Sequence, residues 1–154
     1  MKKRILVVAL LGVALGIARL PAAWAAEEEH EHTEGKMKIP DTAAGIWSEV
    51  KEHEEQLGKI ITDKKLDKVH EVAFEIRDMV NALPDKSKDL AADKLAKVKT
   101  NTKFIADLAD RLDKSGDAND QAGTEANFKK LQGILKTIEA QYAPEMLKSA
   151  EKKE

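Results

Sequence analysis

The sequence predicts an all-α protein, an antiparallel up-down-up-down four-helix bundle that follows a cleaved signal peptide. Composition is the first observation behind this prediction, because 35% of the residues are charged and only 4% are aromatic, which is typical of helical proteins. Periodicity is the second, because apolar residues recur at intervals of three and four in four segments. Short links join these segments, and four such helices pack most simply with consecutive helices antiparallel.

Residues 1–25 are predicted to be a signal peptide. Lys2, Lys3 and Arg4 form a basic start, an uncharged apolar run follows, and the motif Ala-Trp-Ala at 23–25 has small residues at both positions that a signal peptidase reads. The apolar run is short for a hydrocarbon core about 30 Å thick, which favours cleavage after residue 25 over a retained anchor. The protein is therefore expected in the periplasm, with no membrane span after cleavage.

The composition also limits the possible functions. The chain has no cysteine, which excludes disulfides, thiol catalysis, thiolate metal sites and haem attached through cysteine. Removal of 25 of the 154 residues takes away four of the 26 basic residues, so the remaining 129 residues carry 22 basic and 28 acidic side chains, a net charge of −6. The two signs are interspersed, so nucleic acid is not expected as a partner. No catalytic motif is present, and the protein is predicted not to be an enzyme.

Four parts follow one another along the chain. They are the signal peptide at 1–25, a disordered acidic and histidine-containing segment at 26–40, the four-helix bundle at 41–145 and a charged tail at 146–154. The segment after the signal peptide is polar and has no periodicity, which is typical of disorder.

The first two helices are predicted to form a hairpin. The first opens at Asp41 or Thr42, because either side chain can cap free backbone amides. A tight turn at 62–65 connects it to the second helix, which runs to about residue 83. Pro84 stops the second helix, because the residue before a proline resists the helical conformation.

The third and fourth helices complete the predicted bundle. Ser87 is a candidate cap for the third helix, and Gly116 is expected to close that helix in the left-handed conformation. The fourth helix is expected to start between residues 117 and 124 and to end near Pro144. Pro144 then separates the bundle from the charged tail.

Two histidines lie beside the predicted core of the hairpin. His53 shares a spacing of three and four with Val50 and Leu57, so it occupies a seam position. With the turn centred near residue 63, residues whose numbers sum to about 126 face each other. His70 then lies one turn from His53, and the two imidazoles are expected to converge.

Two interpretations of these histidines stay open. In the first, the imidazoles hydrogen-bond to carboxylates and Arg77 pairs with Glu49, which fixes the register of the hairpin at little net stability. In the second, His53 and His70 bind a divalent transition metal together with Glu49 and Glu52. Imidazole and carboxylate ligands suit copper, zinc or nickel, and the interiors of helix bundles host such sites.

Two further segments invite a metal interpretation. His30 and His32 alternate with glutamates after the signal peptide and could chelate copper, nickel or zinc loosely, although a soluble acidic linker is the simpler interpretation. The acid-rich segment at 113–123 lacks the EF-hand pattern, because, counted from Asp113, the sixth position is alanine and the twelfth, Thr124, is not glutamate. Asp117, Asn119 and Asp120 are therefore interpreted as turn and cap residues.

The segments "IWSEVKEHEEQLGKII" and "VHEVAFEIRDMVNALP", with the stretch at 108–142, resemble a group of small secreted bacterial helix-bundle proteins found near heavy-metal efflux systems. This resemblance implies a periplasmic bundle in metal homeostasis or efflux, with His53 and His70 in the matching segments. The fold is also similar to periplasmic four-helix-bundle cytochromes. Their haem ligands are missing, because the fourth helix has no histidine and the chain has no cysteine pair.

Two alternatives to metal binding follow from the same sequence. The first is a structural or partner-binding module that docks onto an envelope or efflux protein and binds no metal. The second, more remote, is a haem held between His53 and His70.

Overall fold

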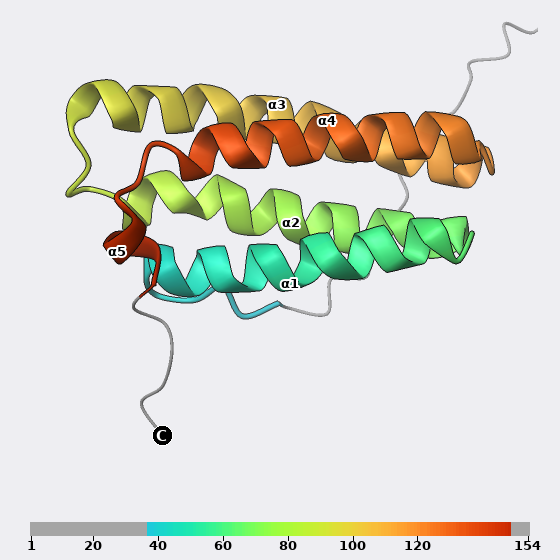
Figure 1. The fold of residues 1–154 in the computed structure, drawn as a ribbon, viewed down its shortest axis with the longest axis horizontal. Coiled ribbons are helices and arrows are strands. Elements are labelled where there is room, and N and C mark those ends of the chain that lie inside the picture. Colours follow the sequence, from blue (N-terminus) through green and yellow to red (C-terminus); the bar gives the residue numbers. More distant parts are fainter. Residues whose placement is uncertain (1–36, 149–154) are drawn as a thin grey trace, which may run out of the picture. The chain divides into compact units, whose positions relative to one another are not determined.

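The computed structural model describes residues 37–148 of the 154. The predicted signal peptide, the segment that holds His30 and His32, and residues 149–154 lie outside the described residues. The described part is an all-α bundle of four long helices packed antiparallel, as the sequence predicts (Figure 1). Its elements are α1 (Ala43–Thr62), η1 (Leu66–Lys68), α2 (Val69–Ala82), η2 (Leu83–Lys86), α3 (Ala92–Asp117), α4 (Gln121–Glu139) and α5 (Pro144–Leu147).

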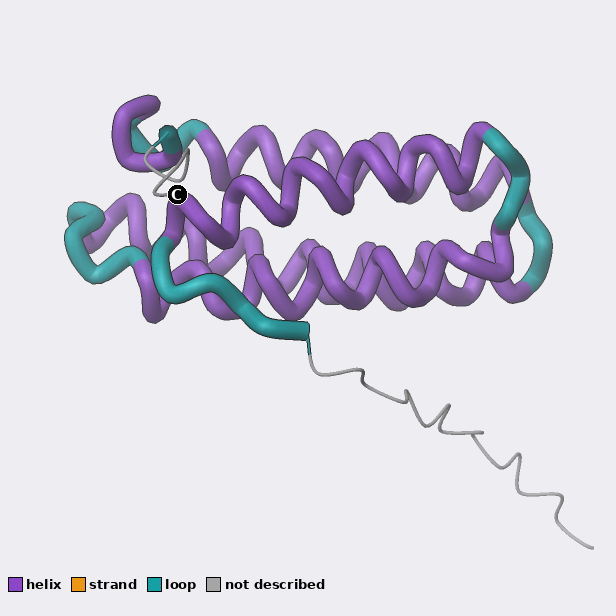
Figure 2. The backbone as a smooth tube through the Cα atoms, turned by 90° about the horizontal axis from the view of Figure 1, so that it is seen from below, coloured by secondary structure: helices purple, strands orange, loops and turns teal. Residues whose placement is uncertain are grey.

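Each long helix packs against its neighbours in the chain, and α4 returns to lie beside α1 (Figures 1 and 2). The short helix α5 packs on α1, and its Met146 and Leu147 lie against the core. The turn between α1 and α2 and the turn between α3 and α4 therefore lie at the same end of the bundle. Within residues 37–148, no helix is both long and apolar enough to cross a membrane.

One apolar stripe on each long helix builds the core. Burial of a large aliphatic side chain contributes about 1.5–3 kcal/mol, so these stripes dominate the stability of the bundle. The largest fully buried side chains from the four helices include Ile46, Leu57, Ile76, Met79, Ile105, Leu112, Leu131, Leu135 and Ile138. They come from the segments in which apolar residues recur at intervals of three and four, and Met79 fills the core beside them.

Most helix ends agree with the predicted caps and stops. The Thr42 side chain accepts a hydrogen bond from the Gly45 amide at 3.0 Å and so caps α1. Pro84 follows the end of α2, where the chain tightens into η2. The Asp120 carboxylate accepts a hydrogen bond from the Gly123 amide at 2.9 Å, which caps α4 inside the predicted range.

The two predictions for the ends of α3 are wrong. Ser87 does not cap α3, which begins at Ala92 without a side-chain cap; Ser87 is buried instead. Gly116 lies inside α3 and does not take the left-handed conformation, which Asn119 adopts with φ 51°. Asparagine tolerates that region better than most residues with a Cβ, so the turn needs no glycine, and Gly116 is free to serve the close contact described below.

Ser87 instead makes a buried contact with the end of the chain. Its hydroxyl lies 2.8 Å from the Tyr142 hydroxyl, 55 residues away. The contact joins the loop before α3 to the segment between α4 and α5. Burial raises the pKa of the Tyr142 phenol, and the hydrogen bond with Ser87 acts in the opposite direction but does not cancel the rise.

Replacement of Tyr142 by phenylalanine removes the hydrogen-bond partner of a buried hydroxyl. We expect a loss of about 1–3 kcal/mol in the free energy of unfolding, because the Ser87 hydroxyl stays buried without this partner. The double variant Ser87→Ala/Tyr142→Phe should lose less than the two single losses combined. Urea denaturation of all four proteins measures this coupling, and strictly additive losses would show that the two hydroxyls do not interact.

The raised pKa of Tyr142 also predicts how stability depends on pH. The unfolded chain loses the phenol proton near the ordinary value of 10.0, and the folded protein loses it at higher pH. Between these two points the folded state holds more protons, so this group makes stability fall as pH rises. Tyr142→Phe lacks the effect, so the stability gap between the wild type and Tyr142→Phe should narrow as the pH rises through 10.0. A constant gap in urea midpoints would contradict this.

Candidate functional site

His53 ties α1 to α2. Its Nδ1 lies 2.8 Å from the backbone carbonyl oxygen of Glu49, and its Nε2 lies 3.2 Å from the carboxylate of Glu75 on α2. A carbonyl oxygen only accepts hydrogen bonds, so Nδ1 is the donor. Since both ring nitrogens are engaged, His53 can ligate a metal only after one of these contacts breaks.

His70 has different neighbours from those of His53. One ligating atom each from His70, Asp113 and Asp117 lie within 4.8 Å of one another. The two aspartates belong to α3, so His70 faces α3 and not α1. The expected convergence of His53 and His70 is therefore wrong.

The geometry of α2 explains why the two histidines diverge. His70 and Glu75 are five residues apart, which corresponds to a rotation of about 140° around an α-helix. Since Glu75 meets His53 of α1, His70 points from the other edge of α2. The register along the hairpin is nevertheless close to the prediction, because the contacting residues 53 and 75 sum to 128 and not 126.

Arg77 follows the same rule as His70. The two residues are seven apart, so they lie within about 20° of each other around α2. Arg77 Nε donates to Asp78 at 2.8 Å, and the guanidinium lies 4.3 Å from the centre of the Phe74 ring. Among the described residues its ion pair is thus with Asp78, and the expected pair with Glu49 is wrong.

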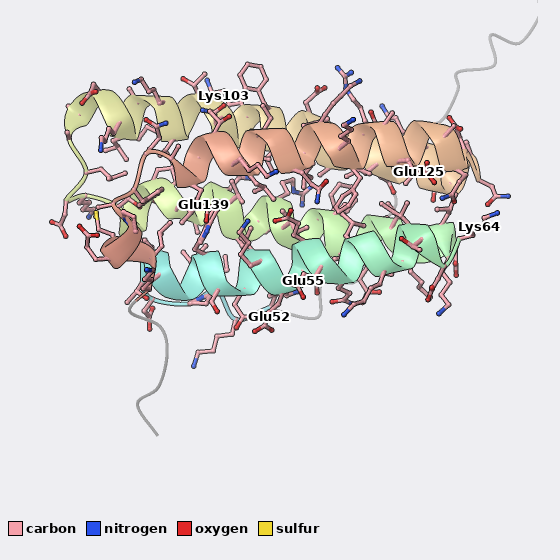
Figure 3. All side chains as sticks on the ribbon, viewed as in Figure 1. Glu52, Glu55, Lys64, Lys103, Glu125 and Glu139 are labelled. Atoms are coloured by element: carbon pink, nitrogen blue, oxygen red, sulfur yellow. The ribbon has the colours of Figure 1, made fainter. Side chains whose placement is uncertain are left out.

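The two predicted glutamate ligands lie on the exposed side of α1. Glu49 offers His53 its backbone carbonyl and not its carboxylate. Glu52 projects from the outer side of α1, away from the other helices (Figure 3). Neither carboxylate belongs to the cluster around His70.

The sequence pattern missed Asp113 and Asp117 as site residues. It placed them in an acid-rich segment and assigned Asp117 to a turn, whereas α3 continues to Asp117. Their spacing of four is the signal that identifies a shared helix face, but only once the segment is known to be helical. His70 and Asp113 are half-buried, Asp117 is exposed, and none of the three side chains is without a partner.

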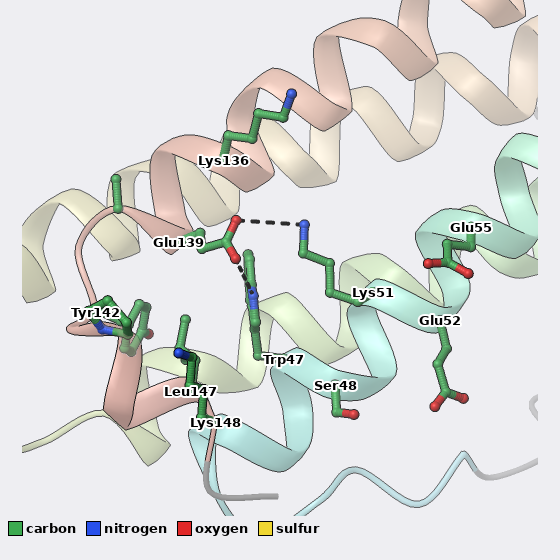
Figure 4. A pocket seen from close by; sticks show the side chains of 12 residues that line it. Trp47, Ser48, Lys51, Glu52, Glu55, Lys136, Glu139, Tyr142, Leu147 and Lys148 are labelled. Carbon is green, nitrogen blue, oxygen red and sulfur yellow. Dashed lines mark hydrogen bonds and ion pairs between the residues drawn. The ribbon is translucent and has the colours of Figure 1, made fainter. Parts of the chain in front are cut away.

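A cleft of about 850 Å³ lies at the other end of the bundle, between α1, the end of α4 and α5 (Figure 4). The carboxylate of Glu139 accepts a hydrogen bond from the Trp47 indole at 3.3 Å and lies 3.6 Å from Lys51 Nζ. Lys51 Nζ in turn lies 5.5 Å from the centre of the indole ring. These three groups satisfy one another and join α1 to α4.

Among residues 37–148, His70, Asp113 and Asp117 are the group whose ligand atoms could hold a metal ion. The arrangement joins α2 to α3 at the end of the bundle where the α1–α2 and α3–α4 turns lie. Comparison with known proteins found no matching family model, no similar curated protein and no similar solved structure.

Proposed function

We propose that this protein is an exported, non-enzymatic helix bundle that binds a divalent transition metal through His70, Asp113 and Asp117, in metal homeostasis or efflux in the periplasm. The observation that carries the proposal is the convergence of one imidazole and two carboxylates from α2 and α3 within 4.8 Å. Export is inferred from the basic start, apolar run and Ala-Trp-Ala motif of residues 1–25.

The ligand set indicates the class of metal. One imidazole nitrogen and two carboxylate oxygens suit zinc, nickel or copper(II), and the absence of cysteine removes the thiolates that soft ions such as copper(I) prefer. Three protein ligands leave at least one coordination position for water. An open position at a half-buried site allows the metal to exchange, as a buffering or carrier protein requires.

A bound ion requires a small contraction of the cluster. Zinc ligands lie about 2.0–2.2 Å from the metal, so the ligand atoms of a tetrahedral centre lie roughly 3.3 Å apart. The observed spread of up to 4.8 Å is wider, and side-chain rotation must close the difference. Asp117 is exposed, and rotation of its carboxylate meets little steric resistance.

Electrostatics favours a cation at this position. Like charges four residues apart on a helix repel by about 0.2–0.5 kcal/mol, and carboxylates in the last turn oppose the helix dipole. Asp117 lies in the last turn of α3 and four residues after Asp113, so it combines both disadvantages. A divalent ion offsets both and replaces the partners that these side chains have in its absence.

The other histidines have secondary roles in this proposal. His53 serves the α1–α2 contact, and its direction toward Glu75 argues against a haem held between His53 and His70. His30 and His32 form a second, loose metal-binding segment, which any test of the bundle site has to remove.

Metal titration of the mature chain tests the proposal. In a His30→Ala/His32→Ala background, calorimetric titration with zinc, nickel or copper(II) should show about one equivalent bound. Asp113→Asn and His70→Ala should each weaken that binding by about tenfold or more, because each removes one ligand from the set.

His53→Ala is the matched control, because it removes the other imidazole of the same helical hairpin. Its affinity should equal that of the parent protein. Equal weakening by His53→Ala and His70→Ala would show that the cluster is not the site, and no binding by the parent protein would end the metal proposal.

A partner-binding module is the second candidate function, and Phe104 is the observation that favours it. This large apolar side chain on α3 is 52% exposed, although single exposed apolar residues are common. The partner in this proposal is an envelope or efflux protein that covers the outer side of α3.

The partner proposal predicts a selective loss of binding. Phe104→Ser should abolish retention of an envelope protein that the wild type retains, because it removes the apolar contact area. Ile39→Ser is the matched control, since Ile39 is the other exposed large apolar residue in the described part. Equal retention by the wild type and both variants in an affinity pull-down would exclude Phe104 as the contact.

A further inference from the structure

Gly116 lies at a close approach between α3 and the chain that enters α2. A Cβ built on Gly116 would lie 2.8 Å from the Leu66 carbonyl oxygen and 3.3 Å from the Val69 Cβ. Real Cβ atoms essentially never come closer than 3.0 Å to another heavy atom. The Leu66 oxygen belongs to the backbone, so it cannot rotate aside as a long side chain can. The approach therefore requires a residue without a side chain.

This close approach lies beside the three candidate ligands His70, Asp113 and Asp117. Asp113 precedes Gly116 by three residues and Asp117 follows it directly, so both carboxylates project from the same turn of α3. On the other side of the gap, His70 directly follows Val69. The separation of α3 from the start of α2 thus sets the distance between the carboxylates and the imidazole.

We propose that Gly116 is the positioning residue of the metal site: its missing side chain lets α3 lie close enough to the start of α2 for the two aspartates and His70 to share one cation. This inference rests on the proposed metal-binding function. Metal sites hold each ligand atom within about 0.2 Å of its preferred distance from the metal. A methyl group at Gly116 forces α3 and the Leu66 carbonyl apart, because 2.8 Å is closer than the 3.0 Å that real Cβ atoms keep. This separation adds to the contraction that the ligand atoms already need to hold an ion.

Gly116→Ala tests the proposal, and Gly133→Ala is its matched control. Gly133 is also a helical glycine and lies on α4. A Cβ built there meets nothing within 4 Å. With zinc chloride as the probe and the His30→Ala/His32→Ala chain as the parent, Gly133→Ala should bind with unchanged affinity. Gly116→Ala should bind about tenfold or more weakly, with the helical circular dichroism of the parent.

A longer ligand provides a readout that a purely structural defect would not change. If Gly116→Ala weakens binding by widening the gap, Asp117→Glu should restore part of the affinity in the Gly116→Ala chain, because its carboxylate reaches one methylene further. In the parent chain the same change should not increase affinity. Should Gly116→Ala fail to fold, all variants are compared in the Gly133→Ala background, which a better helix former stabilises.

The outcomes separate this inference from the function on which it rests. A parent that binds no zinc overturns both. A parent that binds zinc while Gly116→Ala binds equally well overturns only the role of Gly116. An effect of Asp117→Glu that is the same in both backgrounds also overturns it, because the gap would then not be what the longer side chain compensates.

Discussion

A helix in a four-helix bundle buries one stripe of side chains, and the two edges of that stripe face two different neighbouring helices. This constraint decides what every polar residue beside the core can reach. On α2, Glu75 lies on the edge that meets α1, whereas His70 lies on the edge that meets α3. The polar residues of the hairpin therefore form two separate groups. His53 and Glu75 connect α1 to α2, and His70 lies with the possible ligands on α3.

Burial and local capping explain why the four helices and most of their ends could be predicted from the sequence. The apolar spacing of three and four marks the buried stripe of each helix, and Thr42, Pro84 and Asp120 mark ends through contacts within a few residues. The contact of Ser87 could not be predicted from neighbouring residues, because its partner Tyr142 is 55 residues away. A hydroxyl with such a distant partner has the same local signature as a helix cap.

The candidate site could be predicted less well, for two physical reasons. The register along the hairpin follows from the turn, but a four-helix bundle can turn to the left or to the right, and this choice decides which edge of α2 faces α3. The sequence therefore predicts the position of His70 along the bundle correctly but predicts the wrong neighbouring helix. Asp113 and Asp117 were missed because the acidic stretch has the composition of a loop. The helix continues to Asp117 and packs against η1 through Gly116, a tertiary contact that local propensity does not report.

The arrangement around Trp47 makes this residue an intrinsic fluorescent probe of the bundle. The chain has two tryptophans, and Trp47 is the one in the described part. This residue is 4% exposed, and a carboxylate and an ammonium group lie beside its indole ring. Indole emission depends strongly on nearby charge and on contact with water. In a chain without the first 25 residues, the wavelength and intensity of tryptophan fluorescence therefore report on the contact between α1 and α4 at one end of the bundle. His70 lies at the opposite end of the bundle. A structural change at His70 therefore alters the Trp47 fluorescence only if the helices transmit that change along their length.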